Sequence, residues 1–106
     1  MDPTLKVKKL PVIDLGSVVA TPAALRACSE KRMRELLHRH QHGDWGEEIE
    51  GDAHDLDENE AAAACGRRVF SSYAIDPTKP AQGENRIWII TEGDRSVTTL
   101  LLPDDY

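Results

Sequence analysis

Three histidines at alternate positions form the densest group of side chains that could do chemistry, in the segment His38-Arg39-His40-Gln41-His42. Imidazole can transfer a proton near neutral pH and can bind zinc. On a helix, His38 and His42 would share a face while His40 would point elsewhere. Zinc would then need a further ligand such as Asp44 or His54, and no motif of known spacing supplies one. We expect no metal and no cofactor, which leaves helix-capping or solvated histidines, or one histidine that acts in catalysis or binding.

Arginine and hydroxyl side chains later in the chain could complete a catalytic set with His40. Arg68 precedes Ser72, and Arg95 precedes Thr98. If these residues converge on a concave sheet face, His40 could act as acid and base while an arginine stabilises a pentacoordinate phosphate. Such a set would suffice for RNA cleavage without metal. The same residue types are also common in strands and turns, so a purely structural role is the alternative.

The charges are unevenly distributed along the chain. Residues 43–60 contain nine Asp or Glu and no Lys or Arg, whereas residues 1–42 contain eight Lys or Arg and four acids; the net charge is −6. An acidic segment repels phosphate backbones, which argues against broad nucleic-acid binding. Within it, a tryptophan between two glycines could anchor the loop to the core or contact a partner. The candidate residues for binding a protein partner are Trp45, Asp44, Glu47, Glu48 and Glu50.

Length and composition indicate one domain, residues 1–106, with an ordinary share of apolar residues. No apolar run has the length of a membrane span or a signal peptide, so the expected compartment is the cytoplasm. Cys28 and Cys65 do not form a Cys-x-x-Cys pair. We expect both to be reduced thiols that pack as small core side chains.

The first half of the chain predicts helices. Residues 1–12 are expected to be a flexible lead-in, and residues 12–20 fit a short strand or an extended segment. Thr21-Pro22 is a favourable helix start, and the apolar spacing predicts a helix to about residue 40. The acidic residues 47–57 are expected to form a mobile loop. A short, alanine-rich helix is predicted at about 58–66.

The second half predicts a sheet. Residues 69–75 have strand composition, and residues 76–85 contain two prolines and a glycine, which favours a connecting loop. Two β-rich runs, 86–92 and 97–102, flank a polar break around Gly93, which is typical of a hairpin. The predicted fold is therefore α+β, with two N-terminal helices packed on a C-terminal three-stranded antiparallel meander.

Four stretches of the chain carry a family resemblance: Leu15–Pro22, His40–Gly46, Phe70–Tyr73, and Ile87–Thr99 with the following Leu-Leu-Leu-Pro-Asp-Asp-Tyr. Together they resemble a family of small, uncharacterised bacterial proteins found on plasmids, integrative elements and phages. The expected order of helices and strands is also similar to the fold of barnase, EndoU, colicin and RelE-type ribonucleases. That second likeness implies an acid–base role for His40, phosphate stabilisation by Arg68 or Arg95, and orientation by Ser72 or Thr98.

These observations give two functional hypotheses. The first is a non-catalytic accessory protein of mobile genetic elements that binds a host protein, such as a nuclease or another defence factor. The alternative is a small, metal-independent ribonuclease of the toxin type, for which nucleic acid would be the partner. A third interpretation assigns the polar residues only to the stability of turns. No hypothesis involves a membrane, and the residues do not determine the oligomeric state.

Overall fold

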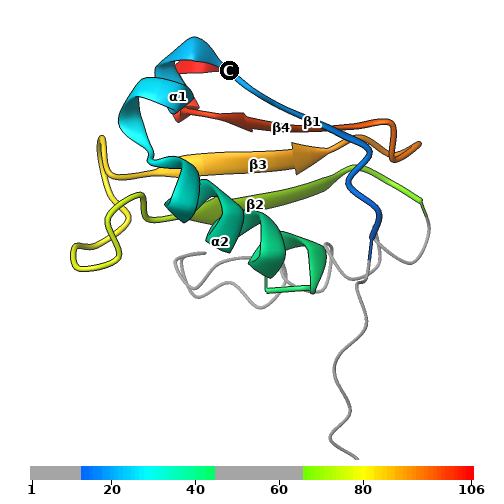
Figure 1. Ribbon diagram of the computed structural model, residues 1–106, viewed down its shortest axis with the longest axis horizontal. Coiled ribbons are helices and arrows are strands. Elements are labelled where there is room, and N and C mark those ends of the chain that lie inside the picture. Colours follow the sequence, from blue (N-terminus) through cyan, green and yellow to red (C-terminus); the bar gives the residue numbers. More distant parts are fainter. Residues whose placement is uncertain (1–12, 45–65) are drawn as a thin grey trace, which may run out of the picture.

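In the described part of the chain, a mixed four-stranded sheet lies at the centre and two α-helices cover one of its faces (Figure 1). The computed structural model describes residues 13–44 and 66–106. The strand order across the sheet is β1-β4-β3-β2. In chain order the elements are β1 (Ser17–Ala20), α1 (Pro22–Ala27), α2 (Glu30–Gln41), β2 (Val69–Tyr73), β3 (Ile87–Thr91), β4 (Val97–Leu101) and the 3-10 helix η2 (Pro103–Asp105).

The sheet confirms the α+β class and corrects the predicted strand arrangement. Strands β2, β3 and β4 pair antiparallel in sequence order. A fourth strand, β1, adds to this meander and runs parallel to β4, with Ser17 opposite Val97 and Ala20 opposite Leu100. The sequence left residues 12–20 as a strand or an extended segment, because a four-residue strand carries little periodic signal of its own.

A glycine allows β1 to approach the β3–β4 hairpin closely. Gly16 has a positive φ of 66°, and a Cβ placed on it would lie 2.4 Å from the carbonyl oxygen of Arg95 and 2.5 Å from that of Ser96. The Ser17 N–H donates to the Ser96 carbonyl at 3.0 Å, directly after this glycine. Position 16 therefore requires glycine. A side chain would overlap the backbone of the β3–β4 turn, and residues with a Cβ rarely adopt a positive φ.

The helix predicted for residues 22–40 is two helices instead of one. Thr21 caps α1 as expected, since its Oγ1 accepts a hydrogen bond from the Ala24 N–H at 3.1 Å. Cys28 is extended, with φ −130°, and Ser29 then caps α2 by accepting from the Arg32 N–H at 3.1 Å. Serine is a preferred N-cap residue, so Ser29 offers a second helix start inside one apolar pattern.

The core lies between the helices and the sheet. Side chains that alternate along the strands point toward α1 and α2, as the period of two in a strand requires. Ala24, Met33 and Leu36 of the helices pack into one apolar cluster with strand residues that include Tyr73, Ile89 and Leu100.

No helix in the described residues is both long and apolar enough to cross a lipid bilayer. The lead-in 1–12, the acidic loop 47–57 and residues 58–65 of the second predicted helix lie outside the described residues.

Candidate functional site

His40 lies at the centre of a buried polar network beneath α2. Its side chain is completely buried, and both ring nitrogens contact hydroxyl groups of the sheet. The His40 Nδ1 lies 2.5 Å from the Ser71 Oγ of β2, and the His40 Nε2 lies 2.8 Å from the Thr91 Oγ1 of β3. Thr91 in turn contacts the Thr98 Oγ1 of β4 at 2.7 Å. The imidazole ring thus joins α2 to β2 and β3, and Thr91 extends the network to β4.

On the Nε2 side of His40, the hydrogen bonds can run in only one direction. The Thr98 hydroxyl donates to the carbonyl oxygen of Leu15 at 2.7 Å, which uses its single proton. Thr91 must therefore donate to Thr98, and it must accept from the Nε2–H of His40. When the imidazole is neutral, its Nδ1 is unprotonated and accepts the Ser71 hydroxyl proton. Every polar atom named in this network has a partner, which meets the requirement for buried polar groups.

Burial keeps His40 uncharged. Desolvation, assisted by the positive charge of Arg95, lowers the pKa of His40 from 6.5 to about 3. A general base works best when its pKa lies near the working pH, and His40 is far from that range. The arrangement suits a structural connection between helix and sheet better than proton transfer to a bound substrate.

The other two histidines of the run lie apart from His40. Their rings face each other one helical turn apart, with centroids 4.1 Å apart, and the His42 Nδ1 lies 2.8 Å from the His38 carbonyl oxygen. His38 and His42 lie at the C-terminal end of α2, where the sequence analysis considered a helix-capping role for the histidines. No group of three or more His, Cys, Asp or Glu in residues 13–44 and 66–106 could hold a metal ion. His54 and Cys65 lie outside those ranges.

The five residues predicted for RNA cleavage do not form one cluster. His40 and Thr98 meet in the buried network, linked through Thr91. Ser72 and Arg68 do not join them, because Ser71, the neighbour of Ser72, is the residue that points toward α2.

Arg68 and Arg95 are both engaged within the protein. The Arg68 Nε lies 3.6 Å from the Glu92 carboxylate, and its Nη1 donates to the Tyr106 hydroxyl at 3.3 Å. Arg95 lies in the β3–β4 turn with a positive φ of 61°. Its Nη1 donates to the Arg67 carbonyl oxygen at 2.7 Å and to the Glu92 carbonyl oxygen at 3.1 Å. The two guanidinium groups therefore stabilise the ends of strands and a turn.

One residue of the predicted partner-binding set is described. The Asp44 carboxylate accepts two hydrogen bonds from Arg39, at 2.8 and 3.2 Å, and its backbone oxygen accepts the Tyr73 hydroxyl proton. Arg39 also lies over the Tyr73 ring, 4.8 Å from its centroid. These contacts fix the end of α2 against β2. The other four residues of that set, Trp45, Glu47, Glu48 and Glu50, lie outside the described residues.

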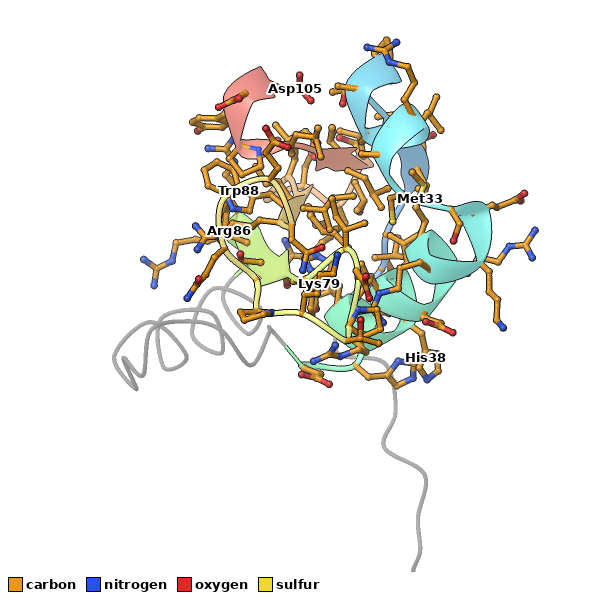
Figure 2. All side chains as sticks on the ribbon, turned by 90° about the vertical axis from the view of Figure 1, so that its left-hand side faces the viewer. Met33, His38, Lys79, Arg86, Trp88 and Asp105 are labelled. Atoms are coloured by element: carbon orange, nitrogen blue, oxygen red, sulfur yellow. The ribbon has the colours of Figure 1, made fainter. Side chains whose placement is uncertain are left out.

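A second feature is an aromatic cluster on the sheet face away from α1 and α2. Phe70 of β2 and Trp88 of β3 are diagonal neighbours across the antiparallel pair, and their ring centroids lie 4.9 Å apart at 63°. Tyr106 extends the cluster, with its ring centroid 5.8 Å from that of Trp88. In Figure 2, Trp88 lies on the side of the sheet opposite Met33 of α2. We call Phe70, Trp88 and Tyr106 the aromatic face.

The aromatic face is partly open to solvent and is bordered by charge. Phe70 is 37% exposed and Tyr106 is 70% exposed, whereas Ile90 and Leu101 on the same side of the sheet are buried. The Arg68 guanidinium carbon lies 5.9 Å from the Tyr106 ring centroid, within the range of a cation–π contact. Neighbouring large aromatic side chains that stay partly exposed are typical of a contact surface.

The sequence interpretation did not find the aromatic face. Phe70, Trp88 and Tyr106 lie far apart in the chain, and only the pairing of β2 with β3 brings the first two together. The alternation of side chains along a strand could have predicted part of it. Ile87, Ile89 and Thr91 share one face of β3, so Trp88 must lie on the other face. No protein-family model, curated protein or solved structure matches this chain.

Proposed function

We propose that the protein is a non-catalytic binding protein that docks a host protein on its aromatic face. The observation that carries this proposal is the aromatic cluster on the side of the sheet opposite the described helices, in which Phe70 and Tyr106 are exposed and Trp88 is partly buried. Tyrosine and tryptophan are enriched among the residues that dominate binding energy at protein interfaces. The sequence predicts a protein of plasmids, integrative elements or phages, and on that prediction a host protein is the expected class of partner.

The His40 network supports a structural role rather than a reaction site. His40, Ser71, Thr91 and Thr98 are all completely buried, so no group of this network meets solvent. The geometry gives no specific support to the ribonuclease alternative, because Arg68 and Ser72 lie on the other face and the pKa of His40 is about 3. That alternative stays a prediction, and incubation of the pure protein with RNA tests it: cleavage that His40→Ala abolishes would revive it.

Affinity capture from a bacterial host lysate tests the binding proposal. The wild-type protein should retain a partner that is lost with Trp88→Ala and with Tyr106→Ala. Tyr106 is 70% exposed, so its truncation should leave the fold intact and separates loss of binding from loss of structure. Leu25→Ala is the matched control, because Leu25 is an exposed apolar residue, 61% accessible, on α1.

Equal capture by the wild type, Tyr106→Ala and Leu25→Ala would contradict binding on the aromatic face. The same assay tests the sequence-predicted set around Trp45. Loss of the partner with Trp45→Ala, but not with Tyr106→Ala, would move the proposed contact surface away from the aromatic face.

A further inference from the structure

A pocket adjoins the aromatic face at one end of the sheet. Its volume is about 560 Å³, within the range of pockets that hold ligands or single anchoring side chains. The lining comes from three separate segments: the end of α1, the β2–β3 loop, and the residues after β4. Its charged residues are Glu84, Arg86 and Asp104.

The pocket and the aromatic face share two chain segments. Arg86 of the pocket lies two residues before Trp88, and Asp104 lies two residues before Tyr106. Figure 2 shows Arg86 next to Trp88 at this end of the sheet. Two residues span about 7 Å in extended chain such as that leading into β3, and about 4 Å in a 3-10 helix such as η2, which contains Asp104. A single extended segment can therefore reach both the aromatic face and the pocket.

The charges of the pocket favour a cation. Glu84 and Asp104 are exposed carboxylates on its wall. The one cationic residue of the wall, Arg86, donates to the Ala81 carbonyl oxygen through its Nη2 at 3.0 Å. Asp105, the next residue after Asp104, accepts from the Thr21 hydroxyl at 2.6 Å and interacts electrostatically with Arg26. The negative net charge of the whole chain, −6, acts in the same direction.

We infer that the partner presents a peptide segment with an apolar or aromatic side chain for the aromatic face and, about two to four residues away, a lysine or arginine for the pocket. This inference rests on the proposed function and specifies the chemistry of its partner. The basic side chain pairs with Glu84 and Asp104, while its neighbour packs on Trp88 and Tyr106. Single-stranded nucleic acid, which also stacks on exposed aromatic rings, is disfavoured because its phosphates would face the carboxylates of the pocket.

Selection from a random peptide library displayed on phage tests the inference. Wild-type protein should enrich peptides that combine an apolar or aromatic residue with a nearby Lys or Arg. The variant Glu84→Gln with Asp104→Asn should keep the apolar preference and lose the basic one. A synthetic peptide from the wild-type selection should bind this variant roughly three- to tenfold more weakly. Trp88→Ala and Tyr106→Ala should enrich neither kind of residue.

The matched control removes the same number of negative charges from another part of the surface. Glu30→Gln with Glu35→Gln removes two exposed carboxylates of α2, each of which pairs with an arginine of the same helix. This variant should select the same peptides as the wild type. If it loses the basic preference to the same extent, the effect is one of overall charge and the pocket is not the site.

The outcomes separate the two proposals. Peptides that depend on Trp88 and Tyr106 but lack Lys or Arg would overturn the pocket inference and leave the proposed function standing. Enrichment that neither Trp88→Ala nor Tyr106→Ala reduces, or no enrichment at all, would overturn both. Tight binding of a single-stranded oligothymidylate that Trp88→Ala abolishes would replace the peptide with nucleic acid as the ligand.

Discussion

His40 shows how burial changes what a residue can do. Histidine is the side chain whose charge changes nearest neutral pH, yet here both ring nitrogens are used inside the protein. A neutral imidazole that accepts on one side and donates on the other can join two strands in a way that few side chains reproduce. The chemistry that makes histidine a candidate for catalysis also makes it a suitable connection in the core.

Ser71 and Ser72 form a natural pair for testing this network. Ser71→Ala removes the donor to the His40 Nδ1 and leaves a buried acceptor unpaired, which should lower the free energy of unfolding by about 1–3 kcal/mol. Ser72→Ala, on the other face of β2, should change it by less than about 0.5 kcal/mol. Urea denaturation of both variants measures the difference. Equal losses would show that the Ser71 contact contributes no more than a surface hydroxyl.

The lowered pKa of His40 predicts a pH dependence of stability. Between pH 6.5 and about 3 the unfolded chain binds a proton that the folded protein does not, so stability falls as the pH falls through this window. The slope from one such group approaches about 1.4 kcal/mol per pH unit. Above pH 6.5 the contribution is fully present and constant.

Denaturation between pH 4.5 and 7 isolates this effect. The carboxylates of Asp76, Asp94 and Asp105 also have lowered pKa values, chiefly from side-chain hydrogen bonds, but their contributions are lost only below about pH 4. Their loss therefore falls at lower pH. His38→Gln, which removes an exposed histidine, should keep the wild-type slope. A wild-type stability that stays constant from pH 6.5 to 4.5 would contradict a buried, neutral His40.

The elements of the fold could be predicted to different degrees. The strands β2, β3 and β4 have strong signals, because each is β-rich and bounded by turn residues. The break between α1 and α2 was not predicted, since Ser29 caps a helix only when Cys28 is extended, and the apolar spacing continues through both. Of the site, the sequence supplied His40 and Thr98 but not their burial, because burial depends on which face of each strand meets α2.

Strand β1 depends on a glycine, and two glycines allow a controlled comparison. Gly16 and Gly83 both have positive φ values, 66° and 55°, but an added Cβ at Gly83 would meet nothing within 4 Å. Gly83→Ala should cost about 1–2 kcal/mol from backbone strain alone. Gly16→Ala should cost clearly more, because its Cβ would overlap backbone atoms of the β3–β4 turn. Thermal unfolding of the two variants checks this, and similar melting temperatures would argue against the close approach.

At the scale of the whole molecule, the two faces of the sheet have different tasks. One face carries the helices, the apolar core and the His40 network, and it holds the fold together. The other carries the aromatic face, which contributes exposed apolar area, and the pocket with its carboxylates lies at the end of the sheet, between the end of α1, the β2–β3 loop and the residues after β4. On this division, substitutions of the first face should reduce stability, and substitutions of Tyr106 or Glu84 should reduce binding with little change in stability.

Photo-crosslinking tests most directly whether a partner docks on the aromatic face. The substitution Tyr106→p-benzoylphenylalanine keeps an aromatic ring on that face and captures whatever lies against it on irradiation. Leu25→p-benzoylphenylalanine, at an exposed position on α1, is the control. We predict a discrete crosslinked protein from position 106 that Trp88→Ala removes, and none from position 25. The same crosslinked protein from both positions, or from position 25 alone, would contradict the assignment of the aromatic face as the contact surface.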